Sequence, residues 1–159
     1  MPPYRQAVMP STVLAVALAT ALLASCGGSS GPEELALTHV ASNELGSVEP
    51  GTYVFRTASE WDAFWAAHPH GGYPARQVPV VDFGSTAVAG VFAGTKGRCN
   101  RLDIVQADTW QGSVTLRYRI TTFGTGTPSS CIGSDMFTLN LADLVLVPKD
   151  TASVTAVAD

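Results

Sequence analysis

The chain has 159 residues, enough for one globular domain of ordinary size but not for two. From Cys26 onward, eight basic residues face thirteen acidic ones, which leaves a net charge of −5 on that part of the chain. This balance argues against nucleic acid as a partner, because nucleic-acid-binding proteins present basic surfaces.

Residues 1–25 have the layout of a bacterial export signal. Arg5 supplies a short positive start, residues 13–23 form an apolar run, and small residues follow it. A membrane-spanning helix needs about 20 consecutive apolar residues, and the Pro-Ser-Thr sequence at residues 10–12 shortens this run. We therefore expect residues 1–25 to be a signal peptide that is removed.

Cys26 follows this signal directly. The Leu-Ala-Ser-Cys sequence at residues 23–26 resembles the lipobox of bacterial lipoproteins, in which the cysteine is acylated, for example with palmitate, and becomes the first residue of the mature chain. Acyl chains anchor a protein in the bilayer without a protein helix. We expect a membrane-anchored lipoprotein of the cell envelope that faces outside the cytoplasm. Gly27 replaces the aspartate of inner-membrane retention signals, which leaves the outer membrane open. The alternative is an ordinary signal with Cys26 as a spare thiol.

The chain is therefore expected to have three parts. The signal peptide covers residues 1–25, a lipidated flexible tether rich in glycine and serine covers residues 26–34, and a single globular domain covers residues 35–159.

The first half of this domain is predicted to contain two strands and one helix. Alternating apolar residues predict strands at residues 35–40 and 52–56. Thr57 stands three residues before a glutamate, which is the spacing of a capping box, and aromatic residues then recur at helical intervals. These signals predict an amphipathic helix near residues 58–68. Its two tryptophans, Trp61 and Trp65, lie on one face, a pattern more typical of a core than of a ligand platform.

The second half is predicted to consist of strands. They are expected at residues 78–81, 87–92, 102–107, 113–121 and 144–147, with a last edge strand at 154–157. The clearest strand, residues 113–121, alternates apolar residues with two arginines: Val114, Leu116, Tyr118 and Ile120 on one face, Arg117 and Arg119 on the other. The expected fold class is α+β, a mainly antiparallel β-sheet or small sandwich with one packed helix.

Cys99 and Cys131 form an even pair in an oxidising compartment, and we expect them to form a disulfide bond. Closing that loop would stabilise the domain by about 3–4 kcal/mol in the chain-entropy model. A metal site or a redox dithiol is the alternative, but the pair lacks a Cys-x-x-Cys spacing and a neighbouring histidine.

Several segments share their pattern with a known family. They are residues 56–68 with their tryptophans, 79–83, 88–92, 94–96 and 144–149. Over most of residues 35–157 the chain thus resembles the C-terminal domain of PrcB, the accessory subunit of a protease complex. The resemblance implies a domain that binds and stabilises a partner protease at the cell surface. The Gly-Arg-Cys-Asn sequence at residues 97–100 departs from the Gly-Gly-Tyr type of turn in that family, so an interface built on this turn is not carried over.

Three histidines and one aspartate are candidates for chemistry. His68 and His70 are close in the sequence, and together with His39 they would supply three ligands to a metal ion. The alternative is that a histidine in the last helical turn interacts favourably with the carbonyl end of the helix. Asp82 ends an apolar run and is interpreted as a turn residue. We expect no metal and no cofactor. Nothing resembles a Gly-x-Ser-x-Gly nucleophile elbow, and we expect no enzymatic activity.

Two features are candidates for partner binding. Trp110 lies at a predicted hairpin tip, where it would anchor a contact if exposed and otherwise belong to the core. Lys96, Arg98 and Arg101 form a basic cluster that is either a contact surface or a solvated turn.

The sequence therefore favours a lipid-anchored extracytoplasmic protein-binding module. The resemblance suggests an accessory or stabilising subunit of a surface protease or envelope complex. A lipoprotein that binds a small ligand or glycan is the alternative, and a hydrolase without a recognisable motif is third. An exposed apolar patch would favour the protein-binding module, and a deep pocket with convergent polar groups would favour the other two.

Overall fold

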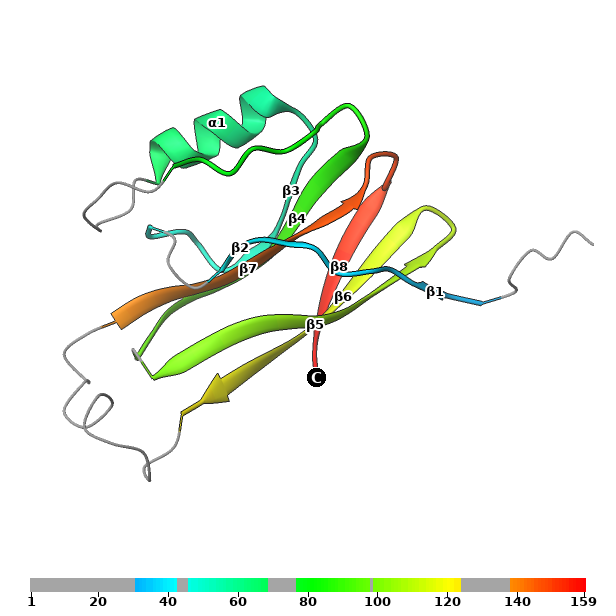
Figure 1. The fold of residues 1–159 in the computed structure, drawn as a ribbon. Helices are drawn as coiled ribbons and strands as arrows, with labels where there is room; N and C mark the ends of the chain where they lie inside the picture. The colour runs from blue at the N-terminus through cyan, green and yellow to red at the C-terminus, as the bar shows by residue number, and fades with distance from the viewer. Residues whose placement is uncertain (1–30, 43–45, 69–76, 98, 124–137) are drawn as a thin grey trace, which may run out of the picture.

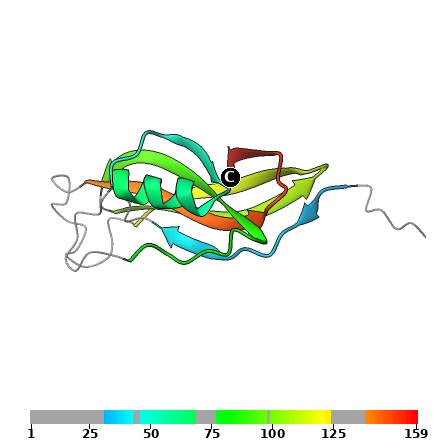
Figure 2. The same cartoon turned by 90° about the horizontal axis from the view of Figure 1, so that it is seen from above.

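The computed structural model describes residues 31–42, 46–68, 77–97, 99–123 and 138–159, which form two packed β-sheets and a helix (Figure 1). The first sheet has the strand order β1-β5-β6-β8, with bounds Glu33–Glu34, Asn100–Trp110, Ser113–Thr122 and Ser153–Ala158. The second sheet has the order β2-β7-β4-β3, with bounds His39–Ser42, Thr138–Pro148, Thr86–Gly97 and Gly51–Phe55. The helix, α1, spans Ala58–Ala67 and covers the outer face of the second sheet (Figure 2). The predicted α+β sandwich is confirmed.

All neighbouring strands are antiparallel except β6 and β8, which pair in parallel. The cause is the chain path, since β8 enters the first sheet from β7 of the second sheet rather than through a hairpin with β6. The predicted edge strand at residues 154–157 is thus confirmed as β8, at the outer edge of its sheet.

The second sheet is buried on both faces. In β4, Ala87, Ala89 and Val91 face the first sheet, while Val88 and Phe92 face α1. This double burial explains why β4 is a continuous apolar run, whereas β6, buried on one face, alternates apolar residues with arginines. The predicted inner face of β6 is confirmed, although burial decreases along it until Ile120 is 39% exposed.

The helix begins as predicted. Thr57 is the N-cap: its hydroxyl accepts a hydrogen bond from the Glu60 backbone N–H, and Glu60 accepts one from the Thr57 N–H. Trp61, Phe64 and Trp65 are buried against the second sheet. The two tryptophans therefore belong to the core, which confirms that interpretation.

Two predicted strands are wrong. Within the predicted strand at residues 35–40, residues 35–38 form no strand and connect β1 to β2, and only His39 and Val40 lie in a strand, β2. Residues 78–81 form no strand. They lie beside α1, where the Pro79 carbonyl accepts a hydrogen bond from the Trp61 indole, and Val80 is fully exposed. In both cases the apolar pattern reflects packing of an irregular segment rather than strand pairing.

Other boundaries also differ. β4, β5 and β7 are longer than predicted, because bulges between Phe92 and Gly94 and between Ile104 and Gln106 shift the register and interrupt the two-residue period. Glu33 and Glu34, assigned above to the tether, form β1, so the ordered domain begins before residue 35.

Candidate functional site

The two sheets meet along two seams, one between β5 and β7 and one between β3 and β8. A buried carboxylate lies in the first seam. Asp143 occupies the inward-facing row of β7 together with Leu141 and Val145, and it is fully buried. Its Oδ2 atom accepts a hydrogen bond of 2.7 Å from the backbone N–H of Ile104 on β5, in the other sheet. Asp143 therefore links the two sheets where β5 and β7 run close together.

His39 on β2 completes this cluster. Its Nδ1 atom lies 2.9 Å from Asp143 Oδ2 and 3.0 Å from Oδ1, while its side chain is 45% exposed. Burial raises the pKa of Asp143, and the hydrogen bonds from His39 and Ile104 act in the opposite direction. A paired aspartate and histidine occur in hydrolases, but within the described ranges no hydroxyl or thiol is hydrogen-bonded to His39. The arrangement shown is a structural bridge between β2, β5 and β7.

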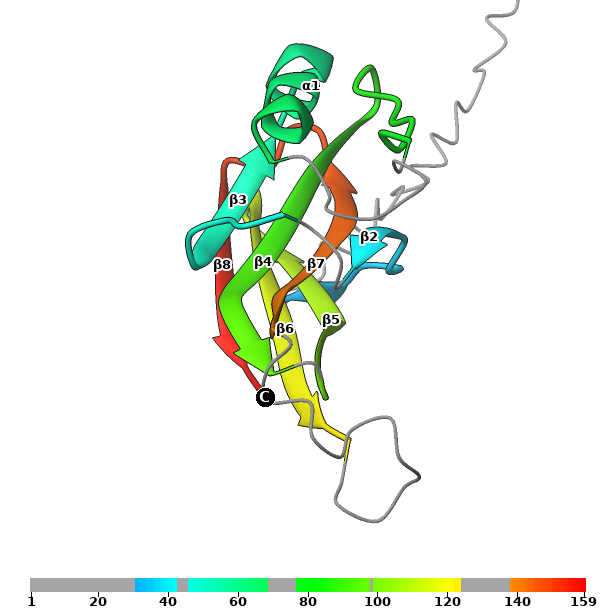
Figure 3. The same ribbon diagram turned by 90° about the vertical axis from the view of Figure 1, so that its left-hand side faces the viewer.

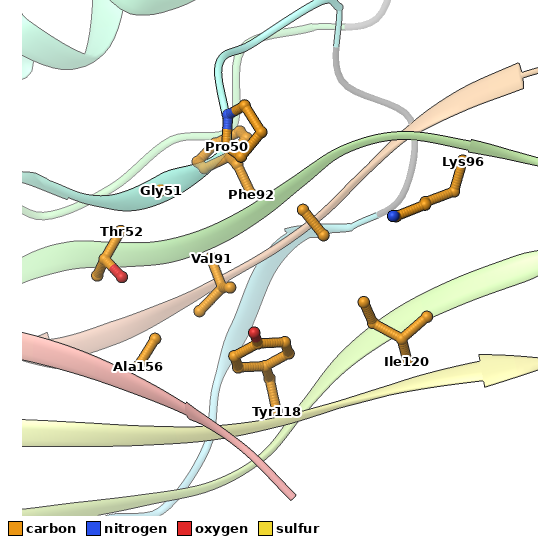
Figure 4. A pocket seen from close by; sticks show the side chains of 10 residues that line it. Pro50, Gly51, Thr52, Val91, Phe92, Lys96, Tyr118, Ile120 and Ala156 are labelled. Carbon is orange, nitrogen blue, oxygen red and sulfur yellow. The ribbon is translucent and has the colours of Figure 1, made fainter.

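The second seam opens into a cavity of about 500 Å³ between β3–β4 and β6–β8, which we call the seam groove (Figure 4). Its lining includes Thr52 of β3, Val91 and Lys96 of β4, Tyr118 and Ile120 of β6, and Ala156 of β8. At the end of this seam near the β7–β8 turn, the Arg56 guanidinium donates a hydrogen bond of 2.7 Å to the Thr151 carbonyl.

Two strand edges border the seam groove. β3 and β8 are the outermost strands of their sheets, and Figure 3 shows them along the same side of the molecule. Among the described residues, no strand pairs with the outer edge of either. The groove thus combines a lining of mixed polar and apolar residues with backbone groups on both sides that are open to a further strand.

Lys96 lies at the rim of the seam groove and is exposed. Within the described ranges it forms no ion pair, whereas Arg101, Arg117 and Arg119 are each paired with an aspartate. The predicted basic cluster is therefore described only in part, and its role as a contact surface stays a prediction. Arg101 is bound to Asp103 at 2.6 Å, and Arg98 lies outside the described residues.

Trp110 is the last residue of β5 and pairs with Ser113 across the β5–β6 hairpin. Gln111 and Gly112 form the turn, both with positive φ angles, 49° and 77°, as in the tight hairpin turns that match strand twist. The Trp110 side chain is 41% exposed. The predicted position at a hairpin tip is confirmed, and the ring is not a core residue.

The remaining candidates are local structure. Asp82 accepts hydrogen bonds from the Ser85 hydroxyl and the Gly84 N–H, and these bonds lower its pKa, which confirms the turn interpretation. His68 Nδ1 lies 2.8 Å from the Phe64 carbonyl at the end of α1, while His70 lies outside the described residues. The described part of the chain contains no group of three or more side chains that could hold a metal ion.

The cysteines are described in part. Cys99 lies in the turn between β4 and β5 and is disulfide-bonded. Cys26 and Cys131 lie outside the described residues, so acylation of the first and the pairing of Cys99 with the second remain predictions.

Sequence reasoning missed both Asp143 and the seam groove. Asp143 stands alone in the apolar run Leu-Ala-Asp-Leu-Val, and a single charge within such a run was the available signal for a buried, bonded carboxylate. The groove had no such signal, because its residues come from strands far apart in the sequence.

Comparison of the chain with protein-family models, with curated proteins and with solved structures finds no match. In the described residues, no helix has the length and hydropathy needed to cross a membrane. The similarity to the PrcB family therefore stays a prediction from the sequence patterns.

Proposed function

We propose that this protein is a lipid-anchored, extracytoplasmic module that binds another protein through the seam groove. The observation that carries the proposal is the groove itself, a cavity of mixed polar and apolar lining between the two sheets, bordered by two strand edges that pair with no strand among the described residues. The sequence contributes the anchor, through the lipobox-like segment that ends at Cys26. The resemblance to the PrcB family makes a surface protease or envelope complex the expected partner class.

An extended segment of a partner protein suits this site. A strand that pairs with β3 or β8 would satisfy backbone groups that lack a strand partner among the described residues. Every second side chain of that segment would then point towards Val91, Tyr118 and Ile120. Lys96 at the rim favours a segment with a carboxylate at that end, because its ammonium group has no ion-pair partner within the described ranges.

A small apolar ligand is the second candidate. The cavity volume of about 500 Å³ lies within the range of small-molecule pockets. However, such pockets enclose most of the ligand, whereas this groove is open to solvent along a seam. These features favour the protein segment.

Site-specific photocrosslinking in native membranes tests the proposal. A photoreactive residue replaces Ile120, which lines the groove and is 39% exposed, in the full-length acylated protein. The matched control replaces Asp62, which is exposed on α1. We expect a discrete protein adduct from position 120 and none from position 62, with the partner identified by mass spectrometry. Equal labelling from both positions, or none from position 120, would contradict the proposal.

A further inference from the structure

The end of the domain that carries Trp110 is also the end at which the chain arrives from Cys26. Glu33 pairs with Thr109 and Glu34 with Asp108, so β1 runs antiparallel beside the last residues of β5. Figures 1 and 2 show β1 next to the β5–β6 hairpin. Residues before Glu33 therefore leave the domain beside the hairpin tip.

The segment between Cys26 and Glu33 is short compared with the domain. A chain of that length spans at most about 25 Å. β5 alone, with 11 residues, is about 36 Å long. An anchor at Cys26 thus holds the hairpin tip near the bilayer, while Lys96 and the far end of β6 extend away from it.

The chemistry of the tip suits a membrane interface. Residues 109–113, Thr-Trp-Gln-Gly-Ser, carry no charge, and Trp110 is 41% exposed. The neighbouring charge of Asp108 is bound by Arg117 at 3.5 Å and by the Gln106 amide at 2.9 Å. Tryptophan is enriched at the headgroup level of bilayers, because its ring is apolar and its N–H is a hydrogen-bond donor.

The lipid class follows from the charges beside the tip. Glu33 and Glu34 are both exposed there and would repel anionic headgroups, whereas Arg56 lies at the same end and donates a hydrogen bond to the carbonyl of Ala152, whose N–H is bonded to Gly112. A zwitterionic headgroup layer is therefore the fitting surface. One tryptophan binds such a surface weakly, but the tether keeps it at a high effective concentration, so a weak contact is sufficient.

We propose that in the anchored protein Trp110 lies in the headgroup layer of a zwitterionic membrane and orients the domain, so that the seam groove stays accessible from outside the bilayer. This inference rests on one part of the proposed function, the acyl anchor at Cys26. It does not depend on which partner occupies the groove.

Fluorescence quenching by brominated phosphatidylcholine tests it. Trp61 and Trp65 are 2% and 7% exposed, so Trp110 is the tryptophan that lipid can reach. The mature protein, acylated at Cys26, is reconstituted in vesicles of this lipid. We expect the bromine atoms to reduce the tryptophan emission of the wild type but not that of W110F. In the matched control W110F/T95W, the exposed ring is moved to Thr95, near the far end of β4, and we expect no quenching there.

Each outcome is informative. If the protein floats with the vesicles and its acylation is confirmed by mass spectrometry, yet wild type and W110F are quenched equally, the orientation is wrong and the anchor stands. If the protein carries no acyl chain and stays in solution, both the orientation and the anchored function are wrong. If the indole introduced by T95W is quenched to the same extent as Trp110 of the wild type, the proposed orientation is also overturned.

Discussion

Replacing Asp143 should reveal how much the bridge between the two sheets contributes to stability. D143A removes a fully buried side chain that accepts a hydrogen bond of 2.7 Å from the Ile104 N–H and contacts His39 at 2.9 Å. A buried N–H left without a partner costs about 1–3 kcal/mol, and the lost contact with a histidine adds about 1 kcal/mol. Removing a buried carboxylate also removes its desolvation cost, which offsets part of this loss.

We therefore expect D143A to lower the free energy of unfolding by about 2–3 kcal/mol. D143N keeps an acceptor for the Ile104 N–H and should lose about 1 kcal/mol. Urea unfolding of the C26S protein, followed by the fluorescence of the buried Trp61 and Trp65, measures both changes. If D143A stays within about 0.5 kcal/mol of the parent protein, the interpretation of Asp143 as a bridge is refuted.

The same bridge predicts a pH dependence. Because burial raises the pKa of Asp143 above its ordinary 3.8, the folded state binds the proton more tightly than the unfolded state. The resulting stabilisation is full below pH 3.8 and is lost as the pH rises through the raised value. The stability of the parent protein relative to D143N should therefore increase as the pH falls from neutrality towards 4. A difference that is constant or shrinks over this range would contradict the stated cause of the shift.

Three further substitutions test the packing at Gly90, the N-cap of α1 and the predicted disulfide bond. G90A should destabilise the domain by about 1–3 kcal/mol, because an added Cβ would lie 2.7 Å from Leu144 Cγ; thermal unfolding measures the loss, and an unchanged midpoint would show that the core yields there. T57A removes the N-cap of α1 and should cost about 1 kcal/mol, measured by urea unfolding, with T57S as the control that restores the bond. C131S should lower stability by about 3–4 kcal/mol, and peptide mapping without reductant should yield a fragment that joins Cys99 to Cys131; its absence would exclude this pairing.

Local signals were sufficient for some elements. The bonds that begin α1 join Thr57 and Glu60, three residues apart, and their residue types predict the helix start without knowledge of the rest of the chain. The alternation in β6 likewise follows from burial of one face. The absence of a strand at residues 35–38, which connect β1 and β2 of different sheets, had no such signal, because a short apolar run does not show whether it pairs with another strand.

The sequence by itself determined the helix, the two faces of β6, the hairpin turn after Trp110 and the α+β class, since each depends on residues that are neighbours along the chain. The tertiary structure decided the parallel pairing of β6 with β8, the burial of Asp143 beside Ile104, and the seam groove. These features arise where strands from distant parts of the chain meet. Their geometry depends on register and on bulges such as the one after Ile104, which the composition of any single segment does not encode.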